Sequence, residues 1–304
     1  MEATKFIWMN GDMVPWDEAR IHVLSHALHY GTGVFEGIRA YQTTMGVGIF
    51  RLTDHMERLR FSARAYGIAL EHSVDQLAKA ARELIAANEM EDGYLRPVAH
   101  LGLGSVGLNP TGAATNVFSA AWRWGAYLGE EGVRNGIKAR VSSWRRIERS
   151  MMVPAAKGTG SYLNSVLAKS EALQSGADEA LLLNAQGHVA EGSGENVFIV
   201  RGGALFTPPP GDGILNGFTR QTVMTLLRDQ GFGVHEVSQT RGDLYGADEV
   251  FLTGTAAEVT PVREIDSRPV GEGSPGPITR LAQELFAKAV RGELDAYRGW
   301  VEPV

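Results

Sequence analysis

The chain has 304 residues, of which 44% are hydrophobic and 21% charged, and its formal net charge is −6. This composition is typical of folded globular proteins, and its acidic balance excludes non-specific binding to nucleic acid. The absence of cysteine excludes disulfides, thiolate metal sites and cysteine nucleophiles. No apolar run reaches the ~20 residues of a membrane span, and Met1–Lys5 lacks the features of a signal peptide, so we expect a cytoplasmic protein.

The first part of the chain carries hairpin, helix and strand signals in turn. Asn10-Gly11 predicts a tight hairpin, and the strand expected at 34–41 contains Gly37, which indicates a bulge or a close approach. Thr53 is expected to cap a helix that runs to about residue 66. The remaining signals are a capping box at Ser73 and Gln76 before a helix at 77–88, strands at 94–101 and 116–122, and a glycine-rich loop at 102–112.

The pattern loosens between residues 125 and 136, where we place a domain boundary. We expect a smaller N-terminal domain at 1–125, a linker at 126–135 and a larger C-terminal domain at 136–304. The later signals are strands at 137–141, 180–183, 197–200, near 234 and at 250–252, and helices at 162–174, 217–230 and 277–290. Runs of strands between isolated helices predict an α+β fold with largely antiparallel sheets.

Lys157 lies among small residues in the stretch 154–162, which ends at Tyr162. Ala155, Ala156, Gly158 and Gly160 would leave room beside its amine for something that is not protein. A neutral, desolvated lysine amine can attack a carbonyl carbon. The alternative is a solvated lysine in a turn.

Three further segments carry groups that bind anions or cations, and each has an ordinary structural alternative. The segment 216–220 opens a helix after a glycine-rich loop, so it predicts an anion site, unless Asn216 is simply an N-cap. The segment 254–258 follows a strand and suits phosphate or carboxylate, or a plain turn. Glu191 and Glu195 flank glycines, where a carboxylate could pair with a buried cationic nitrogen or be solvated.

Three histidines, His22, His26 and His29, are spaced to share one face of a helix and could hold zinc. The ordinary alternative is a packing face or a turn, and no HExxH pattern is present. We expect no metal. A lysine amine, two anion sites, a carboxylate and a tyrosine together suit pyridoxal 5′-phosphate, whose protonated ring is an electron sink.

The sequence resembles the branched-chain amino-acid aminotransferases of the fold type IV pyridoxal-phosphate enzymes. The resemblance covers nearly the whole chain and is specific because many modest motifs occur in the right order. The motifs are Asn10-Gly11, Ser25–Gly31, Phe35–Tyr41, Tyr94–Pro97, Trp124–Gly129, Ala156-Lys157, Glu191–Asn196, Leu215–Arg220 and Gly254–Glu258.

The resemblance implies a role for each matching residue. Lys157 matches the Schiff-base lysine that also moves the proton, Glu191 the carboxylate at the pyridine nitrogen, and Tyr162 the partner of the phenolic oxygen. The implied phosphate and ring contacts are Arg58, Leu215, Phe218, Thr219 and Thr255. The implied substrate contacts are Tyr94, Thr255 and Ala256 for the α-carboxylate, Phe35, Gly37 and Tyr127 for the side chain, Tyr30 and Leu108 from a neighbouring subunit, and Arg96 for the glutamate carboxylate.

The resemblance further implies cofactor binding by the C-terminal domain, with the cofactor between the two domains, and a homodimer or larger homo-oligomer with shared sites. It implies ping-pong transfer of the amino group of L-leucine, L-isoleucine or L-valine to 2-oxoglutarate, as in branched-chain amino-acid biosynthesis. Gly31-Thr32-Gly33 and the run 35–39 favour this activity over transaminases of D-amino acids, while (R)-amine transaminases stay close. A zinc hydrolase using the three histidines and a catalytically silent ligand-binding protein are the alternatives from other classes.

Overall fold

The computed structural model describes residues 2–125 and 127–304, which form two compact units. Unit 1 holds the chain up to Trp124 together with Ala156–Ser161 and Lys288–Val304, and unit 2 holds Gly125–Ala155 and Tyr162–Ala287. The first unit therefore takes in two later segments that the expected division assigned to the C-terminal domain. Ala126, the first residue of the expected linker, lies outside the described residues.

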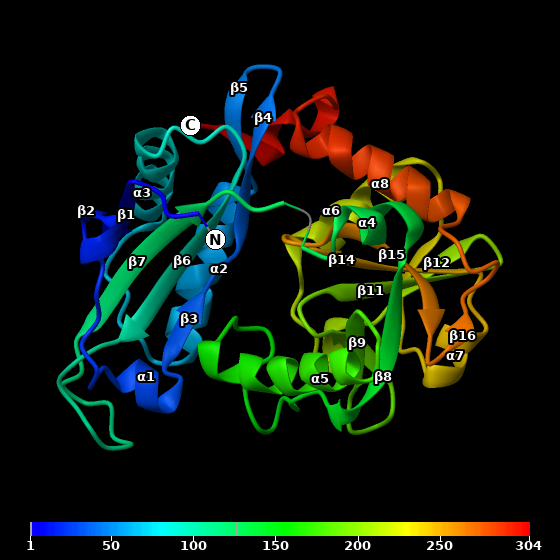
Figure 1. The fold of residues 1–304 in the computed structure, drawn as a ribbon, viewed down its shortest axis with the longest axis horizontal. Helices are drawn as coiled ribbons and strands as arrows, with labels where there is room; N and C mark the ends of the chain where they lie inside the picture. The colour runs from blue at the N-terminus through cyan, green and yellow to red at the C-terminus, as the bar shows by residue number, and fades with distance from the viewer. Residues whose placement is uncertain (1, 126) are drawn as a thin grey trace. The chain divides into compact units, whose positions relative to one another are not determined.

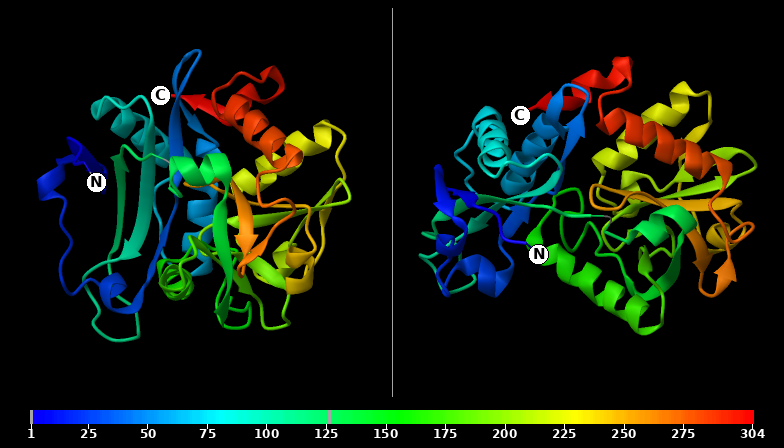
Figure 2. Two further views of the ribbon diagram at one scale, coloured as in Figure 1. Left: turned by 45° about the vertical axis from the view of Figure 1, so that its right-hand side comes forward. Right: turned by 45° about the horizontal axis from the view of Figure 1, so that its top comes forward.

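Unit 1 is built on an antiparallel sheet, with eight strands in the described residues and the order β17-β5-β4-β6-β7-β1-β2. β3 pairs with β6 off this path. Although they come from opposite ends of the chain, β17 and β5 lie side by side (Figures 1 and 2). The strands are β1 (Phe6–Met9), β2 (Asp12–Pro15), β3 (Gly33–Phe35), β4 (Ile38–Thr43), β5 (Gly46–Phe50), β6 (Gly93–Leu101), β7 (Thr115–Trp122) and β17 (Val301–Pro303).

Local signals place most of the elements of unit 1. The hairpin of β1 and β2 turns at Asn10 and Gly11, both at positive φ, and α3 (Val74–Ala87) begins with the predicted capping box at Ser73. The predicted cap of α2 (Leu52–Ala65) is wrong, because Arg51 is the N-cap residue. Thr53 lies inside the helix, where its backbone N–H donates to Glu302 Oε1 at 2.7 Å. A carboxylate from β17 thus satisfies this helix end.

The alternation of side chains along β6 gives its two faces different chemistry. Leu95, Ala99 and Leu101 belong to the hydrophobic core that α2 and α3 complete. The alternate positions, which include Tyr94 and Arg96, point to the opposite side of the sheet. Because β6 lies between β4 and β7, Arg96 lies inside the sheet and not at its edge.

Unit 2 is built on a mixed sheet, with nine strands in the described residues and the order β10-β9-β8-β15-β14-β11-β12-β13. β8 pairs in parallel with β9 and β15, and β12 with β13, while the other pairs are antiparallel. The strands are β8 (Ile137–Arg145), β9 (Glu179–Leu183), β10 (Val189–Gly192), β11 (Asn196–Arg201), β12 (Ala204–Thr207), β13 (Val234–Glu236), β14 (Glu249–Gly254), β15 (Glu258–Ile265) and β16 (Arg268–Pro269).

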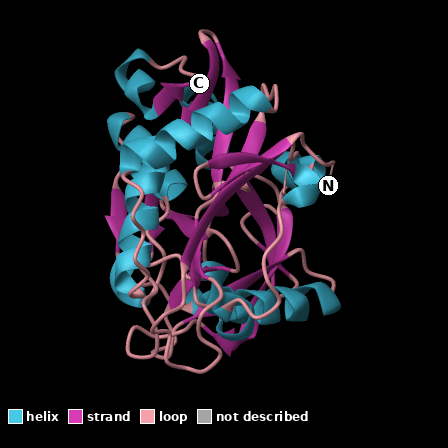
Figure 3. Cartoon of the chain, turned by 90° about the vertical axis from the view of Figure 1, so that its left-hand side faces the viewer, coloured by secondary structure: helices cyan, strands magenta, loops and turns pink. Residues whose placement is uncertain are grey.

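Helices and strands occur together in both units, as Figure 3 shows, and the predicted α+β class is confirmed. Besides α1 (His26–Tyr30) in unit 1, the remaining helices are α4 (Glu130–Asn135), α5 (Tyr162–Gln174), α6 (Phe218–Asp229), α7 (Arg241–Tyr245) and α8 (Pro277–Val290). α5 packs through Ala168 and Ala172 against Ala180 and Leu182 of β9. Among the described residues, no helix is long and apolar enough to cross a membrane.

Candidate active site

The backbone on both sides of Lys157 is tied to β3 and α2 in unit 1. Its N–H donates to Ser62 Oγ at 3.0 Å, and its carbonyl accepts from the Phe35 N–H at 3.0 Å. Gly158 forms a bridge with Val34, and the Thr159 hydroxyl donates to the Gly31 carbonyl at 2.7 Å. These contacts fix the backbone of the segment that carries the lysine, which includes a turn at 154–155, and Lys157 itself is half-buried.

The small residues around Lys157 do not serve the purpose that we expected. A Cβ on Gly158 would lie 2.8 Å from Cε2 of Tyr66, and a Cβ on Gly31 would lie 2.8 Å from Cα of Gly160. The glycines therefore admit a neighbouring aromatic ring and a second backbone rather than empty space. Ala156 is buried, while Ala155 is exposed. The prediction of clearance for a ligand is therefore wrong for Gly158 and Gly160.

A compact group of aromatic rings and one guanidinium lies beside the lysine amine. Lys157 Nζ is 5.0 Å from the centroid of the Phe35 ring, and Arg96 Cζ is 4.8 Å from the same centroid. Arg96 also donates to the Tyr94 hydroxyl at 3.2 Å. A Cβ on Gly37 would lie 1.9 Å from this hydroxyl oxygen, so a side chain approaches this glycine closely. The predicted strand at 34–41 is wrong at this point, because Gly37 lies between β3 and β4.

Arg58 is held by a buried carboxylate that the sequence did not single out. Glu36 is fully buried and accepts hydrogen bonds from Arg58 Nε at 2.7 Å and Arg58 Nη2 at 2.8 Å. His55 Nδ1 lies 2.7 Å from the second oxygen. Burial alone would raise the pKa of Glu36, but Arg58 and His55 outweigh it and lower that pKa well below its usual range. Burial lowers the pKa of His55.

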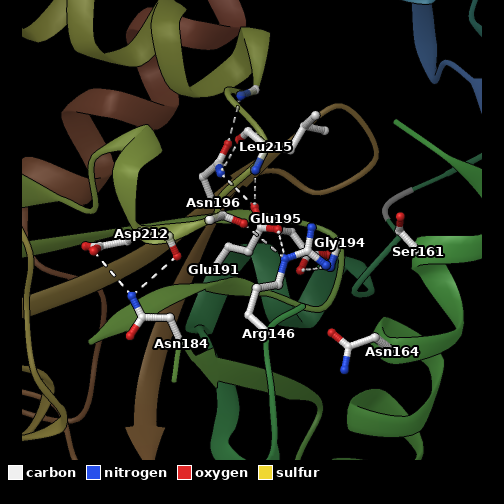
Figure 4. A network of polar contacts seen from close by, with 12 residues as sticks. Arg146, Ser161, Asn164, Asn184, Glu191, Gly194, Glu195, Asn196, Asp212 and Leu215 are labelled. Carbon is white, nitrogen blue, oxygen red and sulfur yellow. Dashed lines mark hydrogen bonds and ion pairs between the residues drawn. The ribbon is translucent and has the colours of Figure 1, made fainter. Parts of the chain in front are cut away.

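Unit 2 contains a second polar group, centred on Glu191 of β10 (Figure 4). Arg146 Nε lies 2.8 Å from Glu191 Oε1, and the Leu215 N–H donates to Oε2 at 2.9 Å. Asn196 Nδ2 donates to the same oxygen at 3.2 Å. Glu191 and Glu195 are only 7% and 5% exposed, so neither is a solvated turn residue.

The two segments of unit 2 that were predicted to bind anions lie where a helix begins and where a strand ends. α6 begins at Phe218 with Gly217 as its N-cap, so the alternative in which Asn216 caps the helix is wrong. Asn216 instead accepts a hydrogen bond from the buried Arg220 at 3.1 Å. Thr219 is buried in the first turn. Thr255 and Ala256 lie in the turn between β14 and β15, which Thr260 closes by donating to the Ala257 carbonyl.

The carboxyl group of Glu195 differs electrostatically from that of Glu191. Among the described residues, the Gly194 N–H is its hydrogen-bond donor, at 3.2 Å. Burial, reinforced by the nearby charge of Glu179, raises the pKa of Glu195 to about 8. The Lys169 amine binds Glu179 at 2.6 Å. Glu195 therefore holds a proton at neutral pH.

This proton makes stability depend on pH. The unfolded chain releases it above an ordinary pKa near 4.5, whereas the folded chain keeps it up to about pH 8. Wild-type stability should therefore fall as pH rises through this window. In Glu195→Gln this loss should be absent, so its free energy of unfolding relative to wild type should rise by roughly 3–5 kcal/mol from pH 4.5 to 8. Urea denaturation of both proteins and of the exposed control Glu130→Gln checks this, and parallel pH profiles of the wild type and the Glu195→Gln variant would contradict it.

Of the other predicted site residues, Tyr30 and Leu108 belong to unit 1, and Tyr127 and Tyr162 belong to unit 2. Tyr30, at the end of α1, is 42% exposed and donates to the Val106 carbonyl at 3.1 Å. Leu108, which lies with Val106 in the loop between β6 and β7, is 83% exposed. In unit 2, Tyr162 is the first residue of α5. Lys169 Nζ lies 5.4 Å from the ring centroid of Tyr127.

The three histidines do not form the predicted helical face. α1 begins at His26, so His22 precedes the helix. His26 contacts Thr32 Oγ1 at 2.8 Å and the Gly107 carbonyl at 2.9 Å, and His29 contacts the Val23 carbonyl at 2.9 Å. In the part of the chain that the structure describes, no three His, Asp or Glu side chains are placed to hold a metal ion. These contacts remove the basis of the zinc hydrolase alternative.

Three polar residues that hold predicted site residues in place were not identified from the sequence, namely Glu36, His55 and Arg146. Glu36 was visible as a charge inside an otherwise apolar strand segment, and His55 and Arg58 have the i, i+3 spacing of one helix face. Arg146 gave no comparable signal, because it directly follows Arg145 at the end of β8. Only the fold distinguishes the two, since Arg145 is exposed and Arg146 is buried.

Unit 1 thus presents an amine beside aromatic rings and a guanidinium, and unit 2 presents a buried carboxylate and the two segments predicted to bind anions. These are the groups that amine–carbonyl chemistry requires. Residues 33–265 match the family described as amino-transferase class IV. The branched-chain-amino-acid aminotransferase of Pseudomonas aeruginosa is 46% identical over 294 residues, which cover 97% of this chain and 95% of that protein.

Solved structures agree with this match. The branched-chain amino acid aminotransferase of Escherichia coli has a TM-score of 0.96 at 45% identity, covering 98% of this chain and 99% of that one. The T.th. branched-chain amino acid aminotransferase, solved with pyridoxamine 5′-phosphate, has a TM-score of 0.96 at 48% identity, covering 100% and 99%. The chain belongs to the class IV aminotransferase family.

Proposed function

We propose that the chain is a pyridoxal-phosphate-dependent aminotransferase that moves the amino group of L-leucine, L-isoleucine or L-valine to 2-oxoglutarate. The observation that carries the proposal is the placement of Lys157 Nζ and the Arg96 guanidinium within 5.0 Å and 4.8 Å of one Phe35 ring. An aliphatic side chain can lie on the aromatic surface, and the carboxylate of a glutamate side chain can bind the guanidinium. One pocket can therefore accept both substrates.

The donor groups fit the proposed cofactor. A pyridoxal phosphate presents an aldehyde, a ring nitrogen and a phosphate, and the chain offers an amine, a buried carboxylate, an arginine and two turns for them. We propose that Lys157 bonds to the aldehyde carbon, that Glu191 faces the ring nitrogen and that Tyr162 contacts the phenolic oxygen. The proposed phosphate and ring contacts are Arg58, Leu215, Phe218, Thr219 and Thr255.

When bound, the cofactor supplies a protonated ring that withdraws electrons from the carbon that carries the amino group. Once the substrate amine has replaced it at the aldehyde carbon, Lys157 Nζ would be free to accept the proton from the substrate α-carbon and to deliver it to that aldehyde carbon. Tyr94, Thr255 and Ala256 would bind the α-carboxylate, and Gly37 and Tyr127 would bound the side-chain pocket together with Phe35. Arg96 would bind the second carboxylate of 2-oxoglutarate.

We further propose a homo-oligomer in which Tyr30 and Leu108 complete the pocket of a neighbouring copy. Both side chains are exposed, by 42% and 83%, so they are accessible to a second copy of the chain, which supports this assignment. The cytoplasmic location expected from the sequence stays a prediction.

An amino-donor panel assayed with 2-oxoglutarate tests the proposal. L-leucine, L-isoleucine and L-valine should each yield glutamate, whereas D-leucine and a simple (R)-amine should yield little. Transfer only from D-leucine or the (R)-amine would instead establish one of the related activities. Binding of pyridoxal phosphate without transfer from any donor would establish a catalytically silent protein.

A further inference from the structure

Two buried glutamates, Glu191 and Glu195, lie four residues apart in unit 2 on either side of a glycine-rich turn (Figure 4). Two carboxylates this close and this deeply buried repel each other, so their charges are coupled. The proposed function requires a negative charge at Glu191, which we place at the ring nitrogen of the cofactor. The surroundings of the two carboxyl groups therefore determine which of them is ionised.

The surroundings of Glu191 favour its charged form. Its two oxygens receive the Arg146 guanidinium at 2.8 Å and the Leu215 N–H at 2.9 Å, with the Asn196 amide at 3.2 Å. Of these three donors only Arg146 carries a full positive charge. Hydrogen bonds from a charged donor are about twice as strong as neutral ones, so the arginine dominates this set.

Arg146 is fixed where it stands. Its backbone N–H donates to the Leu183 carbonyl at 2.9 Å, and its Nε also reaches the Gly213 carbonyl at 3.3 Å. The residue is 8% exposed. Burial and these contacts hold the guanidinium at Glu191, whereas Arg145, one position earlier, is exposed.

Among the residues that the structure describes, no cation pairs with Glu195 in this way. Lys169, the nearby amine, binds Glu179 at 2.6 Å and donates to the Asp178 carbonyl at 2.6 Å. A Cβ on Gly192 would lie 2.8 Å from Glu195 Oε2, and a Cβ on Gly254 would lie 3.3 Å from its Cγ, so the carboxyl is tightly enclosed. Burial without a cation of its own favours the protonated form.

We propose that Arg146 is a positioning residue that keeps the negative charge on Glu191 and leaves the proton on Glu195. Because it depends on Glu191 facing the ring nitrogen, this inference rests on the proposed function. Without the guanidinium, Glu191 would share its charge with Glu195 and would hold the proton on the ring nitrogen less firmly. Arg146 itself touches neither substrate nor cofactor in this account.

The test reconstitutes the full-length protein with pyridoxal phosphate labelled with ¹⁵N in the ring and records the nitrogen resonance by NMR. Wild type and the matched control Arg145→Met should both show a protonated ring nitrogen. Arg146→Met should shift the nitrogen resonance toward that of an unprotonated ring. It should also weaken cofactor binding roughly 10- to 100-fold, which is the effect of losing one charged hydrogen bond. Arg146→Lys should restore part of both. If the methionine variant does not fold, Arg146→Gln, which is neutral but can still donate hydrogen bonds, takes its place.

Two outcomes would overturn the inference. One is a neutral variant at position 146 with the wild-type resonance and affinity. The other is a Glu195→Gln protein that loses ring protonation, because the charge would then reside on Glu195. A wild-type protein that gives no bound-cofactor resonance at all would instead refute the proposed function, so the two failures are distinguishable.

Discussion

Replacing Lys157 by alanine should abolish amino transfer, with a loss in kcat of at least roughly 10⁴-fold. The change removes the only group proposed both to bond to the cofactor and to move the proton. Two backbone hydrogen bonds hold this segment, from the Lys157 N–H to the Ser62 hydroxyl and from the Phe35 N–H to the Lys157 carbonyl, and neither involves the lysine side chain. The variant should therefore fold, and a glutamate-release assay with L-leucine and 2-oxoglutarate measures the loss.

A matched control is Lys79→Ala, in which an exposed lysine of α3 is removed. Its activity should equal that of wild type. A Lys157→Ala protein that keeps a tenth or more of wild-type kcat would show that another group carries the chemistry.

Replacing Glu36 by alanine should lower the free energy of unfolding by roughly 3–5 kcal/mol, because the buried His55 and the half-buried Arg58 lose their shared carboxylate. Cofactor affinity should fall as well, since Arg58 loses the partner that orients it. The lowered pKa of Glu36 also makes stability depend on pH. The Glu36 carboxylate stabilises the fold above its ordinary pKa, and this stabilisation is lost as pH falls toward the lowered pKa. Urea denaturation at pH 7 measures the first effect.

Glu57→Ala is the control, because this residue lies on the same helix but is exposed. Its free energy of unfolding should stay within about 0.5 kcal/mol of wild type. Equal stability of the two variants would mean that the buried carboxylate is not needed to hold Arg58 and His55.

Features set by neighbours in sequence were predictable. The Asn10-Gly11 hairpin and the Ser73 capping box both depend on residues within a few positions of each other, and both are confirmed. Features set by distant residues were not. The end of α2 is satisfied by Glu302, which is 249 positions away, so Thr53 was mistaken for a cap. The strand β10 was not predicted, because it has only four residues and adjoins the glycines of 192–194.

The candidate site shows the same division. The motifs located Lys157, Glu191 and Arg96, but not the residues that hold their side chains and neighbours in place. Glu36 and Arg146 act through pairings between separate elements, which a single sequence does not display. The glycines near Lys157 were predicted to leave room for a ligand. Gly158 instead leaves room for the ring of Tyr66.

Reductive trapping tests the central claim most directly, because it asks which amine bonds to the cofactor. The chain contains six lysines, Lys5, Lys79, Lys138, Lys157, Lys169 and Lys288. Wild-type protein is incubated with pyridoxal phosphate, reduced with borohydride, digested and analysed by peptide mass spectrometry. We predict a stoichiometric phosphopyridoxyl adduct on Lys157, removed by prior incubation with L-glutamate. An adduct spread over the exposed lysines, or one centred on any lysine other than Lys157, would contradict the account.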